Sequence, residues 1–341
     1  MSKVRIGFVG TGGMGQNAHL KNYCTVPECE VVAIAEIRPR LGERVAAKYG
    51  IPKVYTDHNE MIEKENLDGL VASHYFARHP ILIPELLKAG IPVFTEKPLA
   101  STIEGGEKIV QAVKDSGTWM MIGYHKRSDP ATMYAKAEID RLKASGELGR
   151  LTYVRVLMPA GDWVAGGFND LLGTDEAPIA PMEMEPPSPS MDAATFEQYV
   201  SFVNYYIHQV NMMRHLLGEG YKVVFADKSG KLLVVESASG VTGIIEMSPY
   251  VTTIDWQEQN LVAFDHGYVK VTLPAPLAHN RPGSVEVMRD PGGEVTPETM
   301  APTLPWVHAM RQQAMNFVAA IKGEMAPLTT EIGRASCRER V

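Results

Sequence analysis

Three glycines near the N-terminus have the spacing of a phosphate-binding turn. Gly10, Gly12 and Gly15 directly follow a short apolar stretch, Val4–Val9, and precede residues 16–23, which favour a helix. In this arrangement the first glycine allows a tight turn, and the second lets the backbone approach a pyrophosphate. The third lets the helix pack closely on the strand. Unpaired N–H groups at the start of that helix would bind the anion.

A carboxylate ends the second predicted strand, 21 residues after the last glycine of the turn. Glu36 closes the apolar stretch 30–36. A carboxylate here can accept hydrogen bonds from the ribose diol of NAD, but it would repel the 2′-phosphate of NADP. Arg38 could offset that repulsion, although a solvated charge at the start of a helix is the simpler interpretation. The pattern predicts a dinucleotide site that favours NAD and leaves NADP open.

A lysine follows another strand of the same predicted sheet, residues 92–95. Lys97 lies just past this strand, and ligands of doubly wound sheets bind beyond the carboxyl ends of the strands. An ammonium group there can polarise a carbonyl oxygen or hold an alkoxide while hydride leaves carbon. A surface lysine in a tight turn is the alternative interpretation.

A long predicted helix, residues 196–217, carries the second set of reactive side chains. At about 100° per residue, one arc of roughly 60° holds Asn204, His208, Asn211 and His215. Solvated helix faces usually carry Lys and Glu, whereas imidazoles and amides suit a pocket that hydrogen-bonds hydroxyl groups. Histidine can accept a proton at neutral pH. His208 is therefore a candidate acid–base residue, and His215 is more simply structural.

The elements that must position these residues alternate between strands and helices in the first third of the chain. Strands are predicted at 4–9, 30–36, 69–73, 92–95 and 119–122, and helices at 16–23, 39–49, 57–65, 80–89 and 103–116. Such alternation implies right-handed crossovers and a parallel sheet. We expect an N-terminal Rossmann domain, a doubly wound parallel sheet, over residues 1–123.

The pattern changes after a helix predicted at 129–145. Strands at short spacing are predicted at 151–158, 221–226, 231–236, 241–247, 251–256, 261–265 and 268–272, with helices at 196–217 and 306–321. Closely spaced strands with Gly or Pro between them favour antiparallel pairing. Residues 124–330 should therefore form a C-terminal α/β domain with a large open, mostly antiparallel sheet.

A long acidic loop is predicted between the strand and the helix of this second domain. Residues 158–197 contain six prolines and eight carboxylates but no lysine or arginine. Loops of this length in compact folds are often functional lids. No histidine accompanies the carboxylates, so we expect no metal site.

Composition restricts the class of protein. The chain has 341 residues, of which 45% are hydrophobic and 21% charged, a formal net charge of −7 and three cysteines. The charge balance disfavours nucleic acid as a partner, and scattered cysteines form no disulfide framework. Apolar runs are too short for a membrane span, and a strand-like run begins too early for a signal peptide. We expect a cytoplasmic two-domain protein.

The last residues differ from the rest of the chain. Residues 331–341 read as a common sequencing-library adapter translated in frame. We interpret this tail as an artefact and exclude it from the fold prediction. A genuine basic tail is the alternative.

Three motifs after the glycine turn resemble those of one enzyme family, the Gfo/Idh/MocA oxidoreductases. They read Thr95-Glu96-Lys97-Pro98-Leu99-Ala100, Gly123-Tyr-His-Lys-Arg-Ser-Asp-Pro130 and His208-Gln-Val-Asn-Met-Met-Arg-His-Leu-Leu-Gly-Glu219. The resemblance covers residues 4 to about 330. It implies a Rossmann domain joined to an α/β domain, NAD(P)-dependent oxidation or reduction of sugars, inositols or related polyols, and homodimers or homotetramers.

The resemblance also implies residue roles. Lys97 would contact the reacting hydroxyl and the nicotinamide ribose, Pro98 would follow a cis bond, and His208 would be the acid–base residue. Expected cofactor-binding residues are Gly10, Gly12, Gly13, Met14, Gly15, Glu36, Arg38, Ser73, Glu96 and Lys97. Expected substrate-binding residues are Lys97, Tyr124, Lys126, Arg127, Asp162, Trp163, Asn204 and His208. In this set the aromatic ring of Trp163 would pack on a sugar face.

One position departs from the family pattern, in which an aspartate commonly stands four residues before the histidine. This chain has Asn204 there, and an amide cannot accept a proton. Three functions stay open: a sugar or polyol dehydrogenase, a glycoside hydrolase or lyase that oxidises its substrate transiently, and a non-catalytic NAD-binding sensor. Retention of Lys97 and His208 together disfavours the sensor.

Overall fold

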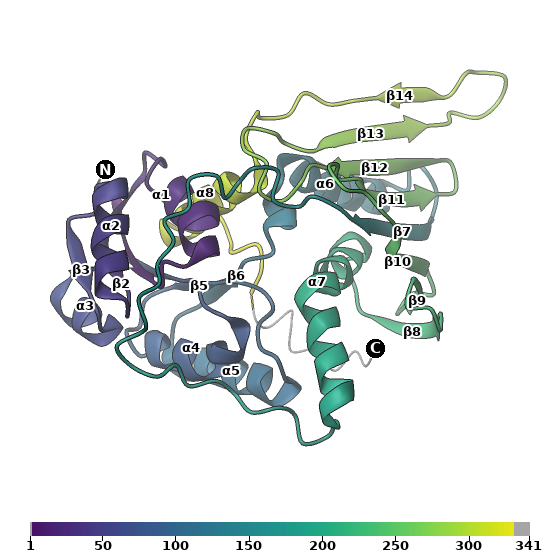
Figure 1. Ribbon diagram of the computed structural model, residues 1–341. Coiled ribbons are helices and arrows are strands. Elements are labelled where there is room, and N and C mark those ends of the chain that lie inside the picture. The colour runs from purple at the N-terminus through teal and green to yellow at the C-terminus, as the bar shows by residue number, and fades with distance from the viewer. Residues whose placement is uncertain (1, 331–341) are drawn as a thin grey trace. The chain divides into compact units, whose positions relative to one another are not determined.

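The chain folds into two compact units in the computed structural model, which describes residues 2–330 (Figure 1). Unit 1 comprises the described residues up to 124, residues 167–205 and the described residues from 313 onward. Unit 2 comprises residues 125–166 and 206–312. The tail interpreted as an artefact, residues 331–341, lies outside the described residues.

Unit 1 is built on a six-stranded parallel sheet in the order β3-β2-β1-β4-β5-β6, which confirms the predicted Rossmann fold. Its strands are β1 (Val4–Val9), β2 (Cys29–Ala35), β3 (Lys53–Tyr55), β4 (Gly69–Ala72), β5 (Val93–Thr95) and β6 (Met120–Ile122). Because β1 pairs with β2 on one side and β4 on the other, the topological switch point of the sheet lies at the end of β1. The sequence pattern missed β3, which is only three residues long.

Helices cover both faces of this sheet (Figure 1). They are η1 (Gly15–Leu20, a π-helical segment), α1 (Lys21–Tyr23), α2 (Pro39–Tyr49), α3 (His58–Lys64), α4 (His79–Leu87) and α5 (Ile103–Ser116). The second half of α8 (Ala309–Ile321) joins them, although it lies far away in sequence. The Phe317 ring contacts the rings of Tyr23 at 6.4 Å and Phe94 at 5.7 Å between centroids. Late residues thus complete the core of the first unit.

Unit 2 contains an eight-stranded sheet in the order β14-β13-β12-β11-β7-β10-β9-β8. Its strands are β7 (Leu151–Ala160), β8 (Tyr221–Ala226), β9 (Leu232–Ser237), β10 (Thr242–Val251), β11 (Glu258–Phe264), β12 (Gly267–Leu273), β13 (Ser284–Arg289) and β14 (Glu298–Met300). All pairs are antiparallel except β7 with β10. The mostly antiparallel sheet is therefore confirmed.

Two details of the predicted second sheet were wrong. The candidate strand at 241–247 continues to Val251 as one strand, β10, and no strand forms over 252–256. Residue Ser248 has a φ of +48°, a local irregularity inside β10 that shifts its register with β7. The pattern also missed β13 and β14, which lie in a segment rich in Gly, Pro and charged residues.

Two helices complete the described part of unit 2. Helix α6 (Pro130–Ser145) begins where the Asp129 carboxylate accepts the N–H of Ala131, as is usual for an N-cap. Helix α7 (Ala193–Leu217) begins earlier than predicted, because Asp192 caps it by accepting the N–H of Thr195 at 2.8 Å. The first part of α7, up to residue 205, belongs to unit 1, and the remainder belongs to unit 2.

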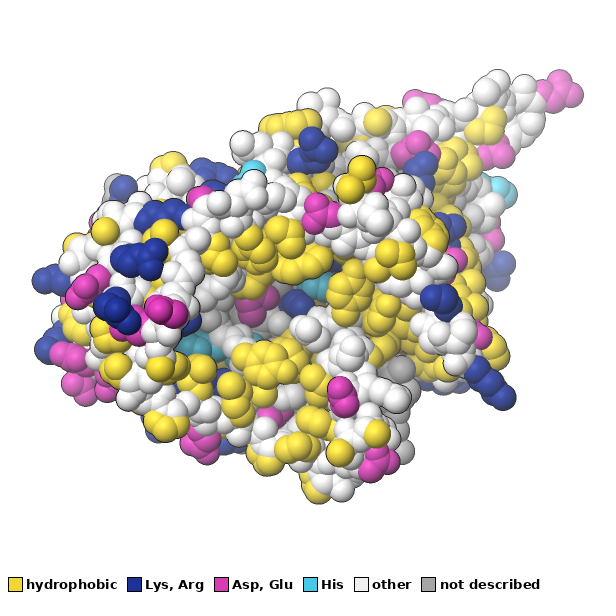
Figure 2. Space-filling view, in the orientation of Figure 1, with side chains coloured by type: hydrophobic (Ala, Val, Ile, Leu, Met, Phe, Trp, Pro, Cys, Tyr) yellow, Lys and Arg dark blue, Asp and Glu magenta, His cyan; other side chains and the backbone are white. Residues whose placement is uncertain are grey.

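Surface charge is mixed. On the face of unit 1 shown in Figure 2, acidic and basic side chains alternate without forming a large field of one sign. Within residues 2–330, no helix combines the length and apolarity that crossing a membrane requires.

Candidate active site

In the glycine turn between β1 and η1, the backbone requires glycine at two positions, whereas the third position faces open space. Gly10 has a φ of +88°, which side chains rarely adopt. A Cβ on Gly15 would lie 2.7 Å from the carbonyl oxygen of Gly10. A Cβ on Gly12 would meet nothing within 4 Å. The second glycine therefore leaves room for a group from outside the chain, which fits the close approach of a dinucleotide pyrophosphate.

A cavity of about 270 Å³ lies beside this turn within unit 1. Five of the residues expected to bind the cofactor line it: Gly10, Gly12, Glu36, Arg38 and Ser73. Its other walls include the loop after β4, His58, and four residues of a later segment: Glu176, Pro178, Met182 and Met184. The other expected cofactor residues, Gly13, Met14, Gly15, Glu96 and Lys97, do not line this cavity.

The carboxylate of Glu36 is 2% exposed and fully engaged by donors. Arg38 donates from Nε to Oε1 at 2.6 Å and from Nη2 to Oε2 at 3.0 Å. The N–H and hydroxyl of Thr11 donate to Oε2 at 2.9 and 2.7 Å. Burial alone would raise the pKa of Glu36, but these hydrogen bonds outweigh it and lower the pKa. The carboxylate is therefore ionised and neutralised by Arg38, so the interpretation of Arg38 as merely solvated was wrong.

The Glu36–Arg38 pair should influence whether the protein prefers NAD or NADP, and a substitution of Arg38 can test this. In Arg38→Ala, Glu36 should repel a 2′-phosphate and should hydrogen-bond a ribose diol without competition. We expect the ratio of the Kd for NADP to the Kd for NAD to rise about tenfold, measured by titration calorimetry. The control is Lys53→Ala, which removes an exposed charge from the edge strand β3. An unchanged ratio in Arg38→Ala would show that Arg38 plays no part in the choice.

Lys97 projects from the turn that follows β5. Its peptide bond to Pro98 is cis, as the resemblance implies. The ammonium donates to the carbonyl oxygen of Asn204 on α7 at 2.8 Å. Glu96 is buried beside it, with Oε1 2.6 Å from Nε2 of His19 and Oε2 accepting the N–H of Lys97 at 3.1 Å. Glu96 therefore fixes the backbone from which Lys97 extends.

A second histidine holds the other side of this turn. His79 is fully buried at the start of α4, and its Nδ1 lies 3.2 and 3.1 Å from the carbonyl oxygens of Pro98 and Leu99. Carbonyls only accept, so Nδ1 carries the proton, and Nε2 can accept from the Thr95 hydroxyl at 3.2 Å. Burial lowers the pKa of His79 and favours this neutral form.

In unit 2, the polar arc of α7 meets the short helix η3 (His125–Ser128). The half-buried ring of His208 packs edge-on against His125, with 5.1 Å between centroids and an interplanar angle of 72°. Arg127 donates from Nε to the Asn211 Oδ1 at 2.7 Å. Two of the predicted substrate-binding residues, His208 and Arg127, thus lie at the contact between α7 and η3. The side chain of Asn204 is exposed.

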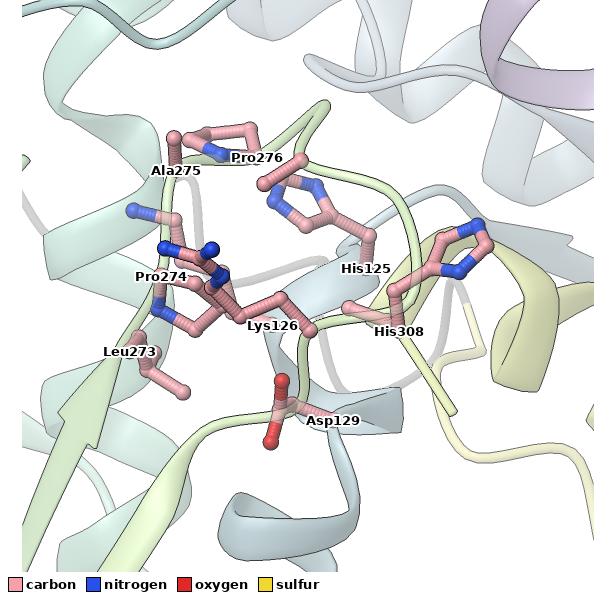
Figure 3. A pocket seen from close by; sticks show the side chains of 11 residues that line it. His125, Lys126, Asp129, Leu273, Pro274, Ala275, Pro276 and His308 are labelled. Atoms are coloured by element: carbon pink, nitrogen blue, oxygen red, sulfur yellow. The ribbon is translucent and has the colours of Figure 1, made fainter. Parts of the chain in front are cut away.

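Lys126 has a different environment from the one that the resemblance implies. Its ammonium is buried and lies 2.6 Å from the Glu258 carboxylate, which also accepts from Trp256 Nε1 at 3.1 Å. Burial lowers the pKa of Lys126, and Glu258 opposes that shift. Figure 3 shows Lys126 with His125, Asp129 and other residues around a cavity of about 10 Å³, the size of one water molecule.

The buried Lys126–Glu258 pair predicts a large loss of stability on truncation. Lys126→Ala leaves a buried carboxylate without its cation, and we expect the free energy of unfolding to fall by about 3–5 kcal/mol in urea titrations. The matched control is Lys270→Ala, which breaks a half-exposed pair with Glu286 and should cost less than about 1 kcal/mol. Equal losses in the two variants would contradict the assignment.

The remaining expected substrate residues are Asp162, Trp163 and Tyr124. Asp162 accepts the N–H groups of Val164 and Ala165, both at 3.0 Å, and so closes a local turn. The Trp163 side chain is partly exposed beside it, and Tyr124 is buried in unit 1. Within residues 2–330, no group of three or more His, Cys, Asp or Glu side chains could hold a metal ion.

Sequence reasoning missed several residues that shape the site. His19, His79 and Glu258 have partners 77, 20 and 132 positions away. A polar residue inside an otherwise apolar stretch signals that a partner exists, but it does not identify that partner. The acidic loop was expected as a lid, without any indication of the unit on which its residues 167–192 lie.

A doubly wound parallel sheet, a glycine turn beside an open cavity and a buried carboxylate after β2 are typical of proteins that bind a nicotinamide dinucleotide. Residues 4–124 match the model of one such group, the Gfo/Idh/MocA oxidoreductase family with an NAD-binding Rossmann fold. This match covers the N-terminal domain of the chain and confirms the resemblance seen in the sequence.

Similar proteins extend the comparison. The chain is 34% identical over 148 residues to the inositol 2-dehydrogenase of Acidothermus cellulolyticus, covering 43% of this chain and 42% of that protein. It is 25% identical over 307 residues to the inositol 2-dehydrogenase of Burkholderia lata, covering 84% and 80%. The NAD binding oxidoreductase from Klebsiella pneumoniae shares the fold, with a TM-score of 0.73 at 17% identity, covering 98% and 94%.

Proposed function

We propose that the protein oxidises a hydroxyl group of a sugar or an inositol-like polyol, with NAD as the hydride acceptor and NADP as an accepted alternative. The observation that carries the proposal is the placement of Lys97. It lies past the end of β5 in the sheet whose switch point opens on the dinucleotide cavity. The names of the inositol 2-dehydrogenase relatives support a polyol substrate.

The residues of this chain would divide the reaction as follows. When bound, the dinucleotide accepts the hydride. The Lys97 ammonium stabilises the negative charge that develops on the substrate oxygen. His208 takes the hydroxyl proton at its imidazole, and the Asn204 amide orients the hydroxyl by hydrogen bonding. Because Asn204 cannot accept a proton, Lys97 and His208 carry the proton transfer between them.

A substrate panel tests the proposal. Inositols, free sugars and aryl glycosides are incubated with NAD, and NADH absorbance and aglycone release are followed together. NADH formed with an inositol or a free sugar, without aglycone release, supports a dehydrogenase. Aglycone release without net NADH would replace the dehydrogenase with a glycoside hydrolase or lyase that oxidises its substrate only transiently.

We also propose that the enzyme works in the cytoplasm as a homodimer or homotetramer, assembled through the second sheet. Strand β8 at the edge of that sheet exposes Val224 and Phe225, and Val251 at the end of β10 is also exposed. Exposed apolar side chains of this kind favour association between copies.

A further inference from the structure

An extended segment that crosses unit 1 lies over the dinucleotide cavity. We call residues 167–192 the strap; they form no regular helix or strand and contain five prolines and six carboxylates but no lysine or arginine. In Figure 1 the strap is the long teal trace that crosses unit 1 and ends at the start of α7. All of its residues belong to unit 1.

The beginning of the strap is fixed beside the glycine turn. Asp170 accepts from Lys21 at 3.1 Å and pairs with Lys48 at 3.2 Å. The backbone of Leu172 makes a reciprocal pair of hydrogen bonds with the Gln16 amide, at 3.0 and 3.1 Å. Gln16 is buried and follows Gly15 directly. The strap therefore starts on the helix that the glycine turn introduces.

The middle of the strap attaches to one wall of the cavity. The Glu176 carboxylate accepts the N–H groups of Arg40 and Leu41 at 3.3 and 3.1 Å, at the start of α2. The N–H of Ile179 then donates to the carbonyl oxygen of Ile37 at 2.9 Å. Ile37 follows Glu36, so this attachment lies next to the carboxylate expected to face the ribose.

The next attachment is on the opposite wall. The N–H of Glu185 donates to the carbonyl oxygen of Ala77 at 2.7 Å, within the short helix η2 (Phe76–Arg78) that follows β4. Residues 180–184 therefore bridge from the loop after β2 to the loop after β4. These two loops are the flanks of the switch point, where the adenosine part of a dinucleotide binds in this fold.

The side chains under this bridge suit a flat ring. Met182 and Met184 line the cavity, although 42% and 40% of their surface is exposed. Tyr75 and Arg78 line the same cavity, and Arg78 Nη1 is buried without a hydrogen-bond partner among the described residues. Thioethers pack well on aromatic rings, and a guanidinium stacks on them.

We propose that residues 180–184 form the outer wall of the adenosine subsite, with Met182 and Met184 packed on one face of adenine and Arg78 on the other. This inference rests on the proposed function only in taking a nicotinamide dinucleotide as the ligand. The ligand sits beneath a bridge with attachments on both sides, so its release requires the Ile179 or the Glu185 attachment to break. The strap therefore slows dissociation of the cofactor.

ADP-ribose is the probe that tests the adenosine wall, because it contains the adenosine and pyrophosphate but no nicotinamide. The variant is Met182→Ala/Met184→Ala, and the matched control is Ile179→Ala, which removes a strap side chain that is 61% exposed and does not line the cavity. We expect the double variant to bind ADP-ribose about tenfold more weakly and to release NADH about tenfold faster in stopped-flow fluorescence. The control should stay within about twofold of the wild type.

The outcomes separate this inference from the proposed function. Equal binding by the double variant and the control would overturn the strap wall while leaving the dehydrogenase intact. Failure of the wild-type protein to bind ADP-ribose would overturn both. The expected binding loss together with no polyol oxidation would support the strap wall and count against the proposed function.

Hydrogen exchange supplies a readout that needs no variant. The N–H groups of Ile179 and Glu185 are the two attachments, so bound ADP-ribose should slow exchange in peptides covering 179–185 about tenfold. Peptides from α6 in unit 2 provide the internal reference. Unchanged exchange in the strap at saturating ADP-ribose would overturn the bridge.

Discussion

Replacing Lys97 with alanine should abolish turnover and leave dinucleotide binding largely intact. The ammonium is the cation at the end of β5, and removal of a group that stabilises a developing oxyanion costs about 10²–10³ in kcat. Lys97 is also expected to share proton transfer with His208, so we place the loss at the upper end, about 10³-fold or more. The ammonium donates to the backbone carbonyl oxygen of Asn204, and an unfolding curve should show that the variant is folded.

The measurement is kcat and KM with the best substrate from the panel, together with the Kd for ADP-ribose. Lys114→Ala is a suitable control because it removes an exposed lysine from α5 in the same unit. Turnover by Lys97→Ala at the wild-type rate would refute the active-site assignment. Loss of ADP-ribose binding in step with kcat would instead give Lys97 a role in cofactor binding.

His208→Ala should lower kcat/KM by about 10²–10⁴-fold, the usual contribution of a positioned general acid or base. It should also flatten the acid limb of the pH profile, because an imidazole can accept the substrate proton only while it is neutral. The side chain is half-buried and packs on His125, so a circular dichroism spectrum and an unfolding curve must show that the variant is folded.

The control for His208 is His266→Ala, an exposed histidine in the turn between β11 and β12 of the same unit. It should leave the pH profile of kcat/KM unchanged. A His208→Ala profile with the wild-type acid limb would remove His208 from the acid–base role, even if the rate fell.

The fold of unit 1 was predictable because its signals are local. The glycine turn, the Gly50 and Gly117 helix ends and the Thr102 cap all lie within a few residues of the elements they delimit. Apolar strands bounded by such residues leave few alternatives to a doubly wound sheet. The strand β3, Lys53–Tyr55, was missed because it is not a buried apolar run like the equally short β5 and β6.

The candidate site was less predictable because its side chains find partners far away in sequence. Lys126 lies within the motif 123–130, and the resemblance placed its side chain near the cofactor or the substrate. The structure pairs it with Glu258, which comes from a strand 132 residues later. The strap is a similar case: prolines and acids predict an extended, exposed segment, but the lysines, arginines and backbone groups that fix its path lie on other elements.

The carboxylate of Glu36 makes cofactor recognition an exchange of partners. An ionised carboxylate offers about four lone-pair positions, and five donors from Arg38 and Thr11 already surround this one. A ribose diol must therefore displace the guanidinium, and the affinity for NAD reports the difference between two sets of hydrogen bonds. Small changes in how firmly Arg38 is held would shift that balance, so a single side chain outside the glycine turn can set the preference between two coenzymes.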